Sequence, residues 1–288
     1  MKKAAYILVG ALLGSGVPAK AQAFLWPTEK GAELFVSVRM ANLRSAPSAT
    51  AGLVDSLPCG SAVQVLEAGT TSLTISGIET PWLKVRYRKD NTDKEAFIWL
   101  GLLALGGYRS GGTQFLYGVD RIVPGPKEKD YTPPAAWQVS VKALDSVGTL
   151  LDQAAFTVQD VEVAGTAGKM LGSLGLRNAK DILRILFGGE ACGIPTYYYY
   201  YAWTGSRFLP LPGKMEVSEA GSFYHTETLL FPGEPGGQPD KLILLTEEGE
   251  EQEGKVDKEG NPVFKVSKSR RVYLWDGEKA MPQVALKR

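Results

Sequence analysis

A thiol and an imidazole are the side chains of this chain best suited to covalent chemistry. A cysteine thiolate activated by a histidine can act as a nucleophile, and Cys192 and His225, the only histidine, could form such a pair. No local motif surrounds Cys192, and no third residue that would orient His225 can be identified. The sequence therefore favours structural roles for both residues over a cysteine-dependent enzyme.

Acidic residues offer a second kind of chemistry. Glycoside hydrolysis uses two carboxyl groups that flank the scissile bond, and the carboxyl-terminal half contains Glu190, Glu216, Glu219 and Glu227. Each of these residues is also typical of a solvated surface position, and their separation in space does not follow from the sequence. A cell-wall or glycan hydrolase that uses such carboxylates stays open as the alternative function, and no catalytic residue is assigned.

Motifs for metals and nucleotide cofactors are absent from the sequence. There is no C-x-x-C pair and no glycine-rich phosphate-binding motif, and one histidine cannot form a multi-histidine site. The acidic stretch at residues 247–253 lacks the D-x-D-x-D-G order of a calcium loop. We therefore expect no metal site and no cofactor.

The two cysteines, Cys59 and Cys192, also raise the question of a disulfide. An even number of cysteines permits a bridge in an oxidising compartment. The bridge would close a very long loop, and it requires a specific geometry that sequence cannot show. Two separate buried thiols are the favoured interpretation, with the disulfide as the alternative.

Aromatic residues are the first candidates for ligand binding. The stretch PTYYYYYAWTG at residues 195–205 contains five consecutive tyrosines. In a strand, Tyr199, Tyr201 and Trp203 share one face, whereas Tyr198 and Tyr200 share the other. The pattern Tyr-x-Trp-x-Gly recurs at residues 273–277, which predicts two strands that each end in a tight turn. We expect the first face to pack in a core, and Tyr198 and Tyr200 to face solvent or a second layer, where a ligand would bind.

The amino-terminal residues are typical of an export signal. Two lysines precede an apolar run, and Ala21-Gln22-Ala23 resembles a cleavage site. The run is shorter than the roughly 20 apolar residues that a membrane-spanning helix needs. We expect residues 1–23 to be removed, which makes the mature chain periplasmic or extracellular without a membrane span.

The charge of the mature chain argues against a nucleic-acid partner. The 32 basic and 31 acidic residues become 29 and 31 when Lys2, Lys3 and Lys20 leave with the signal. A nearly neutral chain lacks the basic surface that nucleic acid requires.

Short apolar runs separated by turn residues predict an all-β protein. Residues 34–105 are expected to form a small closed barrel, residues 106–113 a glycine-rich linker, and residues 114–288 a larger antiparallel β-domain with a meander or propeller-like hairpins. Residues 178–186 fit a helical face as well, although a strand is favoured. Residues 240–276 predict a long hairpin with glutamates on one arm and lysines and arginines on the other, paired across the strands.

The barrel segment resembles a known family. Residues 42–48, NLRSAPS, are similar to the N-(V/L)-R-x-x-P-(S/T) opening of bacterial SH3 (SH3b) domains, and residues 60–65 and 82–85 resemble that family's G-x-x-V-x-V and W-x-K-V strands. The resemblance covers about a quarter of the chain. Ala96 stands where the family often has a glycine.

The SH3b resemblance implies a barrel of the cell envelope that binds cell-wall peptides or positions a neighbouring domain. A binding groove would use Trp82 and Trp99, and alternation with Leu83 and Val85 makes Trp82 the indole expected to reach the surface. Packing inside the barrel is nevertheless the favoured interpretation for each indole. The sequence as a whole predicts an exported, non-enzymatic binding or scaffolding protein of the bacterial envelope, whose partner is peptidoglycan or an envelope protein.

Overall fold

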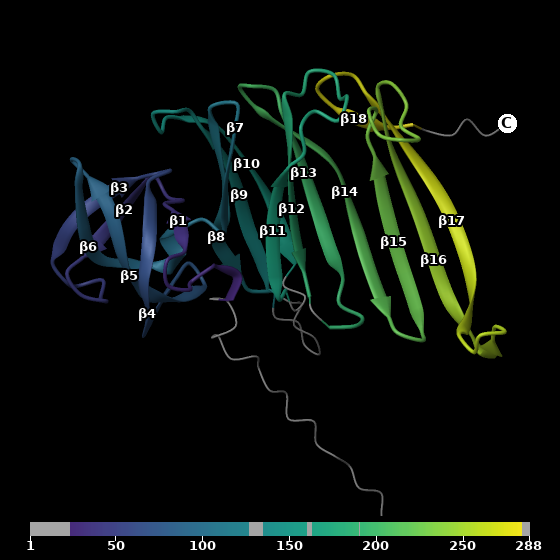
Figure 1. Cartoon of the computed structure of the whole chain (residues 1–288), viewed down its shortest axis with the longest axis horizontal. Helices are drawn as coiled ribbons and strands as arrows, with labels where there is room; N and C mark the ends of the chain where they lie inside the picture. The colour runs from purple at the N-terminus through teal and green to yellow at the C-terminus, as the bar shows by residue number, and fades with distance from the viewer. Residues whose placement is uncertain (1–23, 127–134, 160–162, 190, 284–288) are drawn as a thin grey trace, which may run out of the picture.

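The computed structural model describes residues 24–126, 135–159, 163–189 and 191–283 (Figure 1). This part of the chain is almost entirely β and contains no α-helix, so the predicted all-β class is confirmed. It therefore also contains no helix long and apolar enough to cross a bilayer. The predicted export signal, residues 1–23, lies outside the described residues.

The first sheet is curled, antiparallel and six-stranded, in the order β1-β4-β5-β6-β2-β3. Its strands are β1 (Glu33–Phe35), β2 (Met40–Arg44), β3 (Leu53–Pro58), β4 (Ala62–Ile75), β5 (Ile78–Lys89) and β6 (Thr92–Trp99). Alternate residues such as Val63 and Val65 on β4 point inward and are buried, as expected for strands with one face on a core. A short 3-10 turn, η2 (Leu100–Leu102), leads out of this sheet.

The next sheet has four antiparallel strands in the order β10-β9-β8-β7. They are β7 (Gly106–Ser110), β8 (Thr113–Val123), β9 (Ala136–Leu144) and β10 (Leu150–Gln159). A backbone hydrogen bond from Ile122 N to Ser76 O (2.9 Å) joins this sheet to the turn between β4 and β5 of the first sheet. The two sheets also share one continuous hydrophobic cluster.

The glycine-rich residues 106–113 are part of a β-hairpin and do not form the predicted linker. Gly111 and Gly112 have positive φ angles of 54° and 81°, which a two-residue turn between Ser110 and Thr113 requires. A side chain on Gly107 would collide with the Phe35 ring at 2.5 Å. The glycines thus allow a tight turn and a close approach of the two sheets.

The third sheet is an eight-stranded antiparallel meander whose strands follow chain order, as Figure 1 shows from teal to yellow. Its strands are β11 (Gly165–Met170), β12 (Asp181–Gly188), β13 (Thr196–Trp203), β14 (Phe208–Glu219), β15 (Phe223–Leu230), β16 (Lys241–Val256), β17 (Pro262–Trp275) and β18 (Ala280–Pro282). The region after residue 113 is therefore divided between two sheets, with a meander in place of propeller blades. The strand prediction within residues 178–186 is confirmed by β12.

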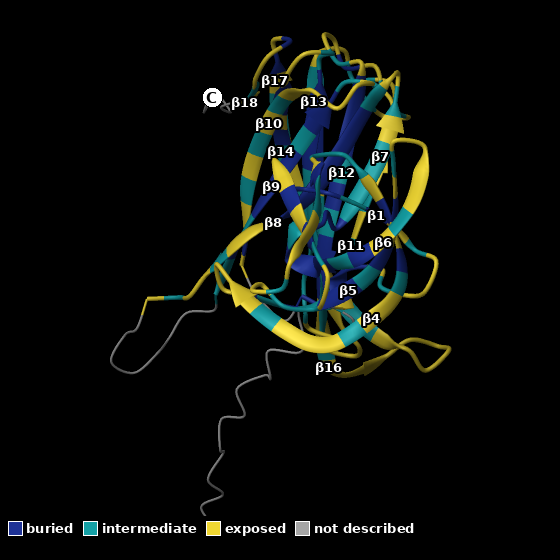
Figure 2. Cartoon of the chain, turned by 90° about the vertical axis from the view of Figure 1, so that its left-hand side faces the viewer, coloured by how far each residue is buried: buried dark blue, intermediate teal, exposed yellow. Residues whose placement is uncertain are grey.

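Strands β12 and β13 are covered on both faces, and Figure 2 shows them as largely buried. On one face, Trp203 packs edge-on against Phe115 of the four-stranded sheet, with ring centroids 5.6 Å apart. On the other face, Ile182 and Tyr200 belong to a second cluster with residues of β15, β16 and β17. Burial on both sides explains why β12 reads as a continuous apolar run without alternation.

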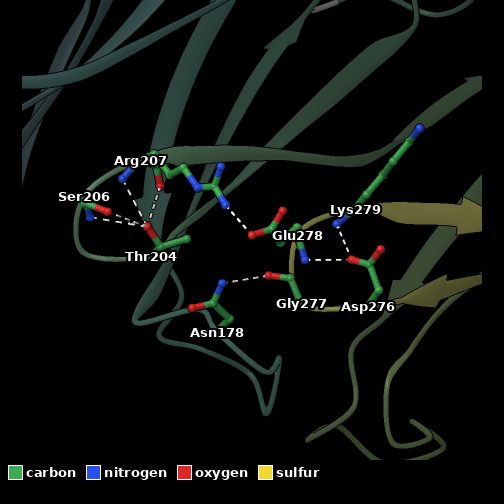
Figure 3. Close-up of polar contacts among 8 residues, drawn as sticks. All are labelled: Asn178, Thr204, Ser206, Arg207, Asp276, Gly277, Glu278 and Lys279. Carbon is green, nitrogen blue, oxygen red and sulfur yellow. Dashed lines mark hydrogen bonds and ion pairs between the residues drawn. The ribbon is translucent and has the colours of Figure 1, made fainter.

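The two copies of Tyr-x-Trp-x-Gly end strands β13 and β17 and lie side by side (Figure 3). Gly205 and Gly277 have φ angles of 106° and 103°, so both turns use the left-handed conformation that glycine permits. Asp276 accepts hydrogen bonds from the backbone of the second turn, and Thr204 accepts equivalent bonds in the first. Asn178 donates to Gly277 O at 2.8 Å. The predicted strand-and-turn units are confirmed.

The long hairpin predicted for residues 240–276 is confirmed by β16 and β17. Asp257 closes its turn, because its side chain accepts the backbone N–H of Asn261 at 2.8 Å. Glu247 faces Lys268 across the strands, and their charged groups lie 2.7 Å apart. Glu250 faces Lys265 in the same register, as the charge pattern predicts.

Candidate functional site

The two tryptophans predicted for a binding groove are buried. Trp82 and Trp99 are 4% and 3% exposed, and both belong to the cluster that joins the first two sheets. Trp99 Nε1 donates to Thr80 O at 3.0 Å. β5 pairs with β6 without a register shift, so Trp82 does alternate with Leu83 and Val85, but the face that carries Trp82 is covered as well. Neither indole can form a surface groove here, and the favoured interpretation, packing in the core, is confirmed.

The tyrosine run is divided between two cores. Tyr199 and Tyr201 lie on the face toward the four-stranded sheet, where Phe156 packs 4.2 Å from the Tyr199 ring centroid. Tyr198 and Tyr200 lie on the opposite face, in the second layer that was the alternative to solvent. Tyr200 is only 5% exposed and packs against Phe231. Of the two predicted binding tyrosines, Tyr198 is the less buried and the one with a carboxylate partner, Glu216.

Strands β12, β13 and β14 assemble that environment. Arg184 on β12 lies opposite Tyr200, and Lys214 on β14 lies opposite Tyr198. The β13–β14 ladder shifts register between Tyr198 and Tyr200, so that Pro212 and Gly213 of β14 lie opposite the single residue Tyr199. This bulge places a cation against the tyrosine ring, a common use of bulges beside functional sites.

The Tyr198 ring lies between two cations and binds a carboxylate. The Lys214 ammonium lies 4.0 Å from the ring centroid, and the Arg184 guanidinium lies 5.6 Å from it. Both distances are within the range of attractive cation–π contacts. The Tyr198 hydroxyl donates to Glu216, whose other oxygen lies 3.3 Å from Lys214 Nζ. The side chain of Lys214 is 16% exposed, so the ammonium is held in place by the ring and the carboxylate.

Burial dominates the acid–base behaviour of the phenols at this site. Burial, helped by the hydrogen bond to Glu216, raises the pKa of Tyr198 to about 12. Burial raises the pKa of Tyr200 to about 12 as well, although the positive charge of Arg184 opposes part of that rise. Both phenols are therefore neutral hydrogen-bonding groups at physiological pH.

A pocket of about 410 Å³ opens beside this cluster, and we call it the Arg184 pocket. It is lined by Lys169, Met170, Leu171, Leu174, Arg184, Tyr200, Lys214, Thr228, Leu229, Phe231 and Glu234. Its one acidic residue, Glu234, is engaged, because it accepts the backbone N–H of Phe231 at 2.8 Å. The pocket is therefore lined by both cations and apolar side chains.

Arg184 has an uncompensated charge within the part of the chain that the structure describes. The arginines that form ion pairs there are Arg86, Arg88, Arg177 and Arg207. Arg184 contacts the ring of Tyr198 and lines the pocket without such a partner. A half-buried guanidinium can bind a carboxylate or phosphate through two parallel hydrogen bonds. The arrangement fits an anionic group attached to an apolar body.

The two cysteines are free thiols, so the alternative of a disulfide is not realised. Cys59 is partly buried and donates a weak hydrogen bond to Ser37 O at 3.6 Å, and burial raises the pKa of its thiol. Cys192 is exposed, contrary to the expectation of two buried thiols. It lines a separate pocket of about 390 Å³ together with Glu216.

His225 is engaged by carboxylates. Its Nδ1 lies 2.9 Å from Glu248 and its Nε2 lies 3.5 Å from Glu227. Glu227 also accepts the backbone N–H of Met215 at 2.7 Å. Only the Glu248 contact is a hydrogen bond, because within the described residues Nε2 has no hydrogen-bond partner, Cys192 included.

The predicted carboxylates do not form a pair around a common cleft. Glu216 is bound to Tyr198 and Lys214, whereas Glu227 contacts His225 and the backbone. Glu219 is exposed, and Glu190 lies outside the described residues. In the described ranges no three acidic, histidine or cysteine side chains gather as they would around a metal ion.

Sequence reasoning did not identify Arg184 and Lys214. Both carried a signal, because Arg184 is a charged residue inside the apolar run DILRILFG, and Lys214 follows the Pro-Gly step of β14. A charged residue inside a buried strand needs compensating partners.

No family model, curated protein or solved structure matches the chain.

Proposed function

We propose that this chain is an exported, non-enzymatic binding protein of the bacterial cell envelope. In this proposal the Arg184 pocket holds the carboxylate end of a cell-wall peptide. The observation that carries the proposal is the Arg184 guanidinium beside the Tyr198 ring, which has no ion-pair partner among the described residues and lines a pocket together with apolar side chains.

The chemistry of the pocket supports a peptide carboxylate. A guanidinium binds a carboxylate through a planar pair of hydrogen bonds, and Lys169 adds a second positive charge. Leu171, Leu229 and Phe231 offer apolar contacts to small side chains such as methyl groups. Pockets that combine a few polar groups with apolar walls are typical of small-ligand sites.

The envelope location rests on the sequence. Residues 1–23 have the pattern of an export signal, and residues 42–48 resemble the opening motif of SH3b domains. Since Trp82 and Trp99 are buried, the proposal assigns ligand contact to the eight-stranded sheet. The curled six-stranded sheet then serves to position that sheet, a role that the SH3b resemblance also implies.

Calorimetric titration with soluble, uncrosslinked cell-wall stem peptides tests the proposal. The wild-type chain should bind them, and Arg184→Gln should weaken binding by about tenfold or more, since a hydrogen bond to a charged group contributes roughly 1.5–3 kcal/mol. Arg109→Gln is the matched control, because Arg109 is an exposed strand arginine outside the pocket. Amidation of the peptide's carboxyl terminus should weaken binding to the wild-type chain. The loss should equal the loss that Arg184→Gln causes with the unmodified peptide.

Three outcomes would count against the proposal. Absence of binding to the wild-type chain removes the cell-wall peptide as ligand. Equal affinity of Arg184→Gln and wild type removes the pocket as its site. Release of reducing ends or free peptides from purified sacculi would instead favour the hydrolase alternative.

A further inference from the structure

The outer edge of strand β17 is open along most of its length. β17 pairs with β16 over Pro262–Trp275, but on its other side β18 covers only Tyr273, Leu274 and Trp275. One further hydrogen bond runs from Gln283 N to Val272 O at 2.8 Å. Residues 262–271 have no neighbour on that side within the described part of the chain (Figure 1).

The direction of the backbone groups on this edge follows from that last hydrogen bond. Val272 directs its carbonyl away from β16, and backbone groups in a strand alternate in direction. The ladder between β16 and β17 has no register shift from Leu274 to Phe264. The N–H and C=O groups of Arg270, Lys268, Val266 and Phe264 therefore point outward, and they form a row of unpaired donors and acceptors.

The side chains of the open edge are basic. Lys265, Lys268, Arg270 and Arg271 all lie on this part of β17 and are exposed, and of these Lys268 is ion-paired with Glu247 of β16. Lysines on an edge strand ordinarily oppose pairing between like edges. A second copy of this chain at the same edge would place positive charges opposite one another, which destabilises a cross-strand pair. The final residues, Lys287 and Arg288, carry the same sign.

Charge and geometry together define the occupant that this edge fits. We propose that residues 264–271 form a docking site for an acidic, extended segment of a partner protein, which adds a further strand to the eight-stranded sheet. Main-chain hydrogen bonds supply affinity in this mode of recognition, and side chains supply specificity. β18 shows that this edge already accepts an extended segment. The site is separate from the Arg184 pocket.

A peptide titration tests the proposal directly. The probe is a fluorescent nine-residue peptide of alternating glutamate and valine, compared by anisotropy with its lysine–valine counterpart. We expect the acidic peptide to bind and to lose affinity as salt is added, because exposed charges are screened. Hydrogen exchange should slow at the amides of Phe264, Val266, Lys268 and Arg270 when the acidic peptide is bound.

Two variants locate the binding site. Val266→Pro removes one outward N–H without removing a hydrogen bond to β16, and proline is tolerated on edge strands. It should weaken binding about tenfold, whereas Val266→Ala, which keeps the N–H, should bind like the wild type. Arg270→Glu should weaken binding about threefold or more, since an exposed ion pair is worth roughly 0.2–1 kcal/mol. If Val266→Pro does not fold, Arg270→Glu alone tests whether the acidic peptide binds at this edge.

The proposal is overturned if both peptides bind equally, or if Val266→Pro and Arg270→Glu bind the acidic peptide as the wild type does. Dimerisation through this edge in sedimentation experiments would identify a second copy as the occupant instead. A chain that ends at Gln283 should bind with unchanged affinity. A gain of tenfold or more would show that the chain's own terminus occupies the edge.

Discussion

The Arg207 guanidinium lies 2.5 Å from the Glu278 carboxylate, although the two residues are 71 positions apart in the chain (Figure 3). Arg207 lies two residues after the glycine of the first Tyr-x-Trp-x-Gly copy, and Glu278 directly follows the glycine of the second. The contact shows that the meander curls until the turn after β17 meets the turn after β13. Two copies of one local pattern thus meet in the tertiary structure.

The Arg207–Glu278 pair should contribute little to stability despite its short distance. Both side chains are more than half exposed, and exposed ion pairs contribute roughly 0.2–1 kcal/mol. A double-mutant cycle with Arg207→Ala and Glu278→Ala, measured by urea unfolding, should give a coupling energy in that range. The coupling should shrink in 1 M salt. A coupling above about 2 kcal/mol would contradict this assignment.

Trp82 should be important for stability. Trp82→Ala removes a buried indole and should lower the free energy of unfolding by about 3–5 kcal/mol. The control is Leu53→Ala on β3, where the side chain is 60% exposed and the change should stay within about 0.5 kcal/mol. Circular dichroism in urea measures both. Equal midpoints for Trp82→Ala and the wild type would show that the indole is not part of the core.

Asp55 should make the six-stranded sheet sensitive to acid. The hydrogen bond from Lys89, followed by that from Ser56 N, lowers the pKa of Asp55 from 3.8 to about 2. Because the folded state prefers the ionised carboxylate, its stabilisation is present above about pH 4 and is lost as the pH falls toward 2. Asp55→Asn should therefore reduce the dependence of stability on pH between 4 and 2. Thermal unfolding across this range measures the slope, and an unchanged slope would exclude Asp55 as its source.

The buried tyrosines should ionise late. Burial raises the pKa of Tyr199, Tyr200 and Tyr201 to about 12 each. Because the folded state holds the neutral phenols, their stabilisation is complete below about pH 10 and is lost as the pH rises toward 12. Tyr201→Phe should reduce that loss. Absorbance at 295 nm and circular dichroism should change together, and complete ionisation below pH 11 in a folded chain would contradict burial of the run.

Local patterns were sufficient for much of the strand structure. Alternating residues and turn signals predicted the hairpin of β16 and β17, where Glu247 meets Lys268 in the expected register. They also predicted the division of the tyrosine run into two faces. Alternation is a property of each strand by itself, so these features need no knowledge of the rest of the chain.

The same rules failed where other layers or irregular pairing decide the outcome. Gly106 and Gly107 looked like a linker, but they allow Tyr117 and Phe35 to approach the backbone. Alternation placed Trp82 opposite Leu83 and Val85 on β5, but both faces of that strand are covered there. A single-strand pattern does not show what covers the outer face of a strand.

The sequence by itself determined that this chain is all-β, that glycines end two similar strands, and that Tyr198 and Tyr200 share a face. Only the tertiary structure decided that Arg184 and Lys214 flank the Tyr198 ring. Those contacts depend on the strand pairing, and on a bulge that sets the register of β14 against β13. The register of strand pairing brings together side chains that are distant in the chain. The local propensity of each strand does not determine that register.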